Sequence, residues 1–166
     1  FGTKEEDIFR EKKLIQFLDN IKNDCSELYI VGDLFDFWFE YRRVVPKGYF
    51  KVLSKLSEFI ENKIPIHYLV GNHDCLLRDY FEKEIGLKIY WNEIERVILG
   101  KKFFIHHGDG LLKNDTGYKI LKAILRNKLN QWLFSLVHPD FGVWLGSISS
   151  NKSRSYTSKK DYGKKD

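Results

Sequence analysis

Three short apolar segments of this chain each end at a glycine beside an acid, an amide or a histidine. LYIV at 28–31 leads into Gly32-Asp33, IHYLV at 66–70 leads into GNHD at 71–74, and FFI at 103–105 leads into HHGD at 106–109. Short apolar runs bounded by glycine are typical of buried strands. Open α/β folds gather their polar sites at the carboxyl ends of such strands, so the pattern predicts one site built from three strand ends.

Amphipathic helices alternate with these segments. Apolar residues recur at helical spacing over 4–20 and 47–62, and a short helix is predicted over 76–85, where Gly86 is a suitable stop. Strands are predicted over 27–31 and 66–70, and a hairpin over 95–99 and 102–105 around Gly100-Lys101. This alternation predicts an α/β fold.

The chain has 166 residues, of which 43% are hydrophobic and 16% aromatic. These values favour one globular domain over disorder. No apolar run is long enough to cross a bilayer, and the first residues, FGTKEED, lack the apolar segment of a signal peptide. The two cysteines form no disulfide framework, and we expect both to be reduced, which suits the cytoplasm.

Residues 118–136 are predicted to form one long helix that is apolar on more than one face and also basic. It either packs on the core, covers a site for an apolar substrate, or rests on a membrane surface. The segment 147–166 follows with six Lys or Arg against two Asp. Such a tail is solvated, or meets phosphates or an anionic membrane. Only Tyr156 and Tyr162 are interleaved with its cations, so nucleic-acid binding is not expected.

The polar residues at the three strand ends form a mixed set of oxygen and nitrogen donors. Asp33, Asn72 and His107, with Asp36 and Asp109, suit Mn²⁺, Fe²⁺ or Zn²⁺ better than Ca²⁺. Two divalent ions about 4 Å apart would activate water and clamp a phosphoryl group. Taken alone, Gly-Asp after a strand usually marks a turn. The histidine of a single His-Gly-Asp is usually hydrogen-bonded within the fold and binds no metal. The three motifs in this order are far more specific.

Three motifs, GDLFDFW at 32–38, GNHD at 71–74 and HHGD at 106–109, resemble those of the calcineurin-like metallophosphoesterases. Within that superfamily, GDLFDFWFEYR, HGDGLL and the helical segment after it look like the UDP-2,3-diacylglucosamine hydrolases of lipid A synthesis. The resemblance implies a four-layer α/β/β/α sandwich with a helical cap. Residues 1–113 would form part of the core, 114–150 the cap, and 151–166 its basic polar tail.

The resemblance also implies roles for single residues. Asp33 would bridge two Mn²⁺ ions, Asn72 and His107 would be further ligands, and His106 would lie behind them or in the core. His73 would be the general acid, with Asp74 orienting its ring. The implied substrate-contacting residues are Asn72, His73, Asp115, Tyr118, Ser153 and Arg154.

Two motifs of the resembled family, D-x-H and G-H-x-H, do not occur in this sequence. We therefore expect the chain to be a piece truncated at both ends, with weak metal binding and little turnover alone.

The whole protein is expected to hydrolyse the pyrophosphate of UDP-2,3-diacylglucosamine to UMP and 2,3-diacylglucosamine 1-phosphate. Its expected place is the cytoplasmic side of the inner membrane of a Gram-negative bacterium. Another metal-dependent phosphodiesterase, acting on nucleotides or nucleic acid, and a non-catalytic binding module of the same fold remain the alternatives.

Overall fold

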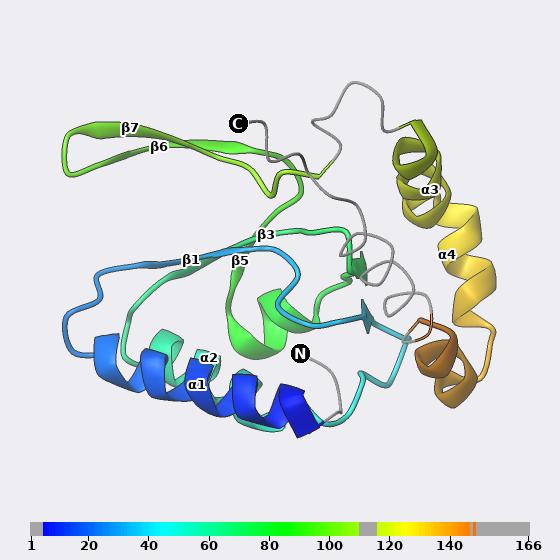
Figure 1. Ribbon diagram of the computed structural model, residues 1–166, viewed down its shortest axis with the longest axis horizontal. Helices are drawn as coiled ribbons and strands as arrows, with labels where there is room; N and C mark the ends of the chain where they lie inside the picture. Colours follow the sequence, from blue (N-terminus) through cyan, green and yellow to red (C-terminus); the bar gives the residue numbers. More distant parts are fainter. Residues whose placement is uncertain (1–4, 110–115, 147, 149–166) are drawn as a thin grey trace, which may run out of the picture.

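The computed structural model describes residues 5–109, 116–146 and 148 (Figure 1). Its centre is a parallel sheet in the order β1-β3-β5, formed by β1 (Leu28–Val31), β3 (Ile66–Leu69) and β5 (Lys88–Tyr90). Two helices, α1 (Glu5–Ile21) and α2 (Phe50–Glu61), lie side by side on one face of this sheet. The predicted α/β class is confirmed, and the described residues form a helix layer and a sheet layer of the expected sandwich.

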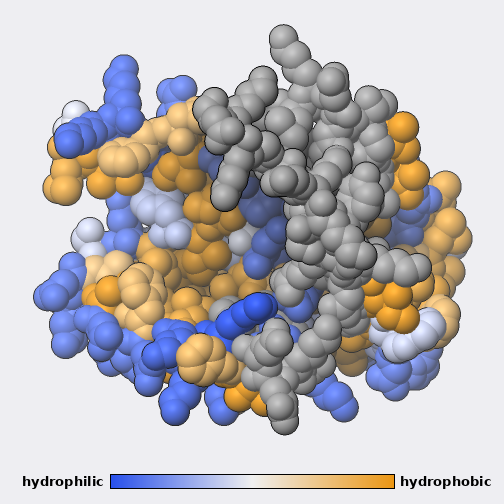
Figure 2. Space-filling view, viewed as in Figure 1, coloured by the Kyte–Doolittle hydropathy of each residue, from blue (hydrophilic) through white to orange (hydrophobic). Residues whose placement is uncertain are grey.

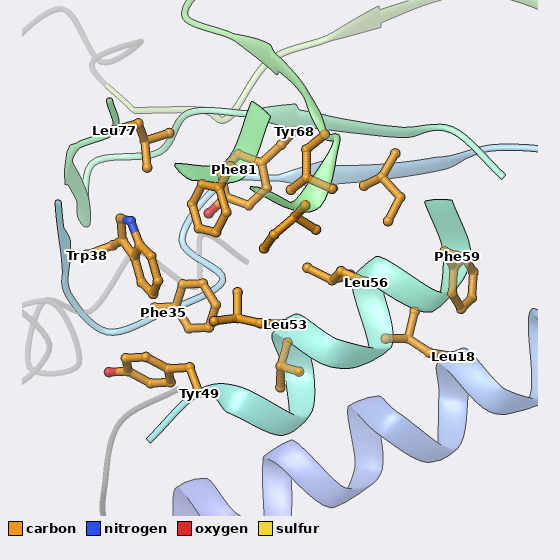
Figure 3. Packing of buried hydrophobic residues seen from close by; sticks show 14 of the residues in the cluster. Leu18, Phe35, Trp38, Tyr49, Leu53, Leu56, Phe59, Tyr68, Leu77 and Phe81 are labelled. Atoms are coloured by element: carbon orange, nitrogen blue, oxygen red, sulfur yellow. The ribbon is translucent and has the colours of Figure 1, made fainter. Parts of the chain in front are cut away.

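The core lies between the sheet and α2, with an aromatic cluster at one end (Figure 3). Helix α2 buries Val52, Leu53, Leu56 and Phe59, a spacing that keeps them on one face. Trp38 packs between Phe35 and Phe81, with ring centroids 4.8 Å away on each side. Helix α1 contributes less than predicted, because Ile8, Phe9 and Phe17 are exposed and Leu18 is the hydrophobic residue that it buries.

The helix predicted over 76–85 is present only over its second part. Leu76 belongs to β4 (Asp74–Leu76), which pairs in parallel with β2 (Trp38–Phe39), and Tyr80–Ile85 forms η1, a turn of π-helix. The cause is the buried carboxylate of Glu40, which accepts hydrogen bonds from the backbone N–H groups of Arg78 and Tyr80. These bonds fix the chain between β4 and η1 in a non-helical path. Gly86 ends η1 in the left-handed conformation, as predicted.

The predicted hairpin is confirmed, with its turn one residue earlier than expected. Strands β6 (Ile94–Ile98) and β7 (Lys101–Ile105) pair antiparallel, with Ile98 opposite Lys101. Leu99 and Gly100 form the turn, at φ values of 50° and 75°. This hairpin projects on the side of the sheet away from α1 and α2 (Figure 1).

The single helix predicted over 118–136 is instead two helices, α3 (Thr116–Arg126) and α4 (Lys128–Ser135), followed by a further helix over 139–146. Asn127 leaves the helical conformation, and its Oδ1 accepts hydrogen bonds from the N–H groups of Leu129 and Asn130. Side chains such as Ile120, Leu129 and Trp132 are exposed, so this segment is not a core element. It stands beside β2 and β4 (Figure 1). Within the part of the chain that the structure describes, no helix is both long and apolar enough to cross a membrane.

Candidate metal and phosphoester site

Three predicted metal ligands, Asp33, Asn72 and His107, lie together at the ends of β1, β3 and β7. The Nε2 atom of His107 is 3.1 Å from Oδ1 of Asn72 and 3.3 Å from Oδ2 of Asp33. Strands β1 and β3 are parallel neighbours, so the two motifs that follow them meet at one edge of the sheet. The expected convergence of three strand ends is thus present in the fold.

Glycines at two positions make this close approach possible. A Cβ on Gly71 would lie 2.2 Å from Oδ1 of Asp33, and a Cβ on Gly32 would lie 2.6 Å from Nδ1 of His107. Gly32 also has a φ of 69°, in the left-handed region. No side chain fits at either position without moving a candidate ligand.

The donor atoms of the cluster suit a cation. Nδ1 of His107 donates to the Val31 carbonyl at 2.7 Å, so Nε2 faces the oxygens of Asp33 and Asn72. The hydrogen bond to Asp33 raises the pKa of His107 to about 9. Burial raises the pKa of the Asp33 carboxyl, but hydrogen bonds from His107 and the His73 amide outweigh it, so that pKa lies below its usual value. The site therefore favours a positive charge among these atoms, and a divalent ion would replace the histidine proton.

Among the described residues, no group of three His, Cys, Asp or Glu side chains can hold a metal without other donors. The Asn72 amide oxygen is the third donor beside Asp33 and His107. An uncharged oxygen, a carboxylate and an imidazole are the mixture that fits Mn²⁺, Fe²⁺ or Zn²⁺. The cluster therefore fits the expected kind of metal with three ligands.

His73 lies beside the cluster, with its Nε2 3.9 Å from Oδ2 of Asp33. Its ring is oriented by the backbone of Asp36, whose carbonyl accepts from Nδ1 at 2.7 Å. The expectation that Asp74 orients this ring is not supported. The Asp74 carboxylate instead accepts hydrogen bonds from the Gly71 amide, the Tyr68 hydroxyl and the Asp33 amide.

Asp74 consequently acts on the backbone of the site. It is 3% exposed, and burial raises the pKa of its carboxyl. Its bonds join the turn after β3 to the turn after β1, which places Asp33 against Asn72. The hydrogen bond from the Tyr68 hydroxyl to Asp74 could not be predicted from the sequence, because a tyrosine in a strand is ordinarily a packing residue.

Asp109 of HHGD pairs with Lys122 of α3 at 2.5 Å, in contrast to its predicted place among the metal donors. Asp36, also predicted among the donors, contributes its carbonyl to His73. His106, expected behind the ligands or in the core, is half-buried, and its Nδ1 accepts from the Gly108 amide. HHGD thus provides one candidate ligand and one contact to the cap.

An apolar pocket of about 180 Å³ lies between β2 and the cap helices. Phe37 and Phe39 line one wall, and Ile124, Leu125 and Phe134 line the other. Phe37 follows Asp36, whose carbonyl orients His73, so the segment that holds the candidate catalytic histidine continues into the wall of this pocket. Four predicted contacts remain predictions, because Asp115, Ser153, Arg154 and the Tyr118 side chain lie outside the described residues.

Comparison with known proteins agrees with this geometry. The chain matches the model of the calcineurin-like phosphoesterases over residues 7–161, and it belongs to that family. It is similar to a protein of Porphyromonas gingivalis named UDP-2,3-diacylglucosamine hydrolase, with 37% identity over 87% of this chain and 55% of the relative.

Proteins of the same name occur among the other similar sequences. The protein of Psychromonas ingrahamii is 33% identical over 74% of this chain and 50% of the relative. The protein of a Shewanella species is 30% identical over 85% of this chain and 60% of the relative. The chain thus spans 50–60% of the length of these curated relatives.

Proposed function

We propose that the whole protein hydrolyses the pyrophosphate bond of UDP-2,3-diacylglucosamine, giving UMP and 2,3-diacylglucosamine 1-phosphate. One observation carries the proposal: the segment that bears Asp33 of the donor cluster leads directly to Phe37, which lines an apolar pocket under the cap. A substrate with a phosphate diester and acyl chains needs both features. The names of the similar proteins support the same substrate.

Asp33, Asn72 and His107 would hold the metal, for which we propose two Mn²⁺ ions. When bound, the metal supplies Lewis acidity toward the phosphate and lowers the pKa of water. His73 would hydrogen-bond the phosphate through Nε2 and give its proton to the leaving oxygen, because Nδ1 is held by Asp36. D-x-H and G-H-x-H supply further ligands in the family and do not occur in this sequence, so we propose little turnover from this chain alone.

The apolar pocket would receive acyl carbons. Burial of each CH₂ group is worth about 0.8 kcal/mol, so part of one acyl chain in this pocket would add substantially to affinity. The same interpretation accounts for the exposed apolar side chains of α3 and α4. The cap interpretation of this segment is therefore part of the proposal.

Activity on a substrate panel tests the proposal. We expect the whole protein with Mn²⁺ to cleave the acylated sugar nucleotide, and Asp33→Ala to reduce the rate to background. Faster cleavage of bis-nucleotides or DNA than of the acylated substrate would make it another phosphodiesterase. Wild-type rates for Asp33→Ala would rule out the assigned metal site.

We further propose that the cap contacts the cytoplasmic surface of the inner membrane of a Gram-negative bacterium. Exposed Leu129, Trp132 and Leu133 on α4, and Leu136 at its C-terminal end, support this, together with nearby lysines. Figure 2 shows apolar residues over this side of the molecule. The whole protein should sediment with vesicles of anionic phospholipid. Leu129→Glu with Leu133→Glu should reduce this binding, and equal binding of both proteins would contradict the proposal.

A further inference from the structure

Helix α3 separates two pockets of opposite chemistry. Lys122 and Arg126, four residues apart on one face, line a polar groove, whereas Ile124 and Leu125 line the apolar pocket on the other side. His107 of the donor cluster also lines the polar groove, and Phe37, next to the residue that orients His73, lines the apolar pocket. The candidate metal site therefore borders the polar groove directly through His107, and α3 lies between that groove and the apolar pocket.

The wall of the groove opposite α3 is the turn from β5 to β6. Trp91, 44% exposed, Asn92 and Glu93 form this wall, at the point where the chain leaves the sheet for the hairpin. An exposed indole offers a face on which a base stacks, and an amide and a carboxylate offer partners for a base edge and for ribose hydroxyls. Arg126 offers a guanidinium for a phosphate.

Lys122 has a different part in the groove. Its ammonium pairs with Asp109, whose side chain is 7% exposed, and this pair joins α3 to the strand end that bears His107. The carboxylate of Asp109 is thereby neutralised, which leaves Arg126 as the lining cation beyond that pair. Lys122 is thus a positioning residue that holds α3, and with it Arg126, against the groove.

We propose that this polar groove is the subsite for the nucleoside monophosphate half of the substrate. The inference rests on the proposed function, because it divides the substrate at the bond that the cluster would cleave. The acyl chains belong to the sugar half, and the apolar pocket lies on one side of α3. The nucleotide half then extends to the other side of α3, into the groove that His107 lines, where the aromatic, amide and guanidinium groups are found.

Product inhibition of the whole protein tests this division of the substrate. UMP and 2,3-diacylglucosamine 1-phosphate are used as separate inhibitors of wild type, Trp91→Ala and Arg126→Gln. Loss of a stacking partner or of a charged hydrogen bond should weaken inhibition by UMP roughly tenfold. Inhibition by the acylated product should stay within about twofold, and Leu125→Asn should show the reverse pattern. Trp144→Ala and Arg43→Gln, exposed residues outside both pockets, are the matched controls.

Each result has a defined meaning. Unchanged inhibition by UMP in Trp91→Ala and Arg126→Gln would overturn the subsite, and so would an equal loss for both products. Absence of cleavage by the wild type would contradict the proposed function instead. In that case calorimetric binding of UMP to the same proteins still decides the subsite, because binding needs no turnover; wild-type affinity in both variants would overturn it.

Discussion

Each residue of GNHD has its own place in the site. Gly71 allows Asp33 to approach, and Asn72 turns its amide oxygen toward His107. His73 stands beside Asp33 with its ring held by a carbonyl, and Asp74 ties the two turns together from within the core. The motif therefore combines one candidate ligand and one candidate acid with two residues that fix the backbone.

Gly71→Ala should disturb the site through crowding alone. The new Cβ would lie 2.2 Å from Oδ1 of Asp33 and 2.7 Å from its amide nitrogen, so Asp33 must move. Overpacking of this kind costs about 1–3 kcal/mol, which urea unfolding measures as a lower midpoint. Gly100→Ala is the control, since Gly100 has a φ of 75° but open space around it. An unchanged urea midpoint in Gly71→Ala, or an equal fall in Gly71→Ala and Gly100→Ala, would contradict this account.

The donor set was predictable at the residue scale, whereas the hydrogen bonds among its neighbours were not. Asp33, Asn72 and His107 follow apolar strands, and a strand end is recognisable from the sequence. The partner of the His73 ring is a backbone carbonyl from another turn, and every residue has a carbonyl. Such a partner follows from the packed fold, as does the bond from Tyr68 to Asp74.

At the scale of elements, the cap depends on the break between α3 and α4. Asn127 Oδ1 accepts from the Leu129 amide at 2.9 Å and from the Asn130 amide at 3.3 Å, which begins a new helix. The break directs Ile124 and Leu125 of α3 and Phe134 of α4 toward the same pocket. One continuous helix would not bring these three side chains together.

Asn127→Ala should loosen α4 while leaving the core intact. Loss of an N-cap costs about 1 kcal/mol, and here the cost falls on a helix that buries no described side chain. Hydrogen exchange of the α4 amides should become severalfold faster, with exchange in α2 and β3 unchanged. Asn62→Ala, at the end of α2, is a control that should leave α4 unaffected. Unchanged exchange in α4 of Asn127→Ala would show that the cap bond is unimportant.

Helices and strands were predictable where they are long enough for their apolar residues to repeat at helical or strand spacing. Helix α2, with twelve residues, and the five-residue hairpin strands lie close to their predicted positions. Strands β2 and β4 have two and three residues, too few for alternation, and the paired Trp38 and Asp74 are distant in sequence. The start of the 76–85 segment was misassigned because its apolar spacing resembles a helix, while Glu40, just after β2, accepts hydrogen bonds from the amides of Arg78 and Tyr80.

For the whole molecule, the site depends on a core that keeps β1 and β3 in register. His67 of β3 is part of that support: it stacks on Tyr29 of β1 at 4.6 Å between centroids, and its Nδ1 is 2.9 Å from the Tyr90 hydroxyl of β5. Burial lowers the pKa of His67, although Glu27 opposes the shift. The folded protein therefore favours a neutral ring at this position.

Stability should consequently decrease in mild acid. The unfolded chain takes up the proton on His67 at a pKa of about 6.5, before the folded protein does. The contribution is complete above pH 6.5 and is lost as the pH falls through the lower folded pKa. Between pH 6.5 and 5, the urea midpoint of His67→Gln should fall less than that of the wild type. An equal fall in both proteins would assign the dependence to other groups.

The overall class of the molecule was predictable, but the surroundings of its site were not. Alternating strands and helices already indicate a parallel sheet with helices on its face. The position of the cap was open, because an amphipathic helix pair fits a core, a cap or a membrane equally well in sequence. Its place against β2 and β4 depends on a small set of distant contacts, among them Lys122 with Asp109 and Phe134 with Phe39.

Metal content tests the central claim most directly, since two adjacent histidines serve as a matched pair. His107 faces Asp33 and Asn72, whereas His106 bonds to the Gly108 amide through Nδ1. The whole protein and its His107→Ala and His106→Ala variants would be loaded with Mn²⁺, dialysed, and measured by mass spectrometry of the metal. The account predicts a lower Mn²⁺-to-protein ratio for His107→Ala and the wild-type ratio for His106→Ala. Wild-type metal content in His107→Ala, or an equal loss in both variants, would contradict it.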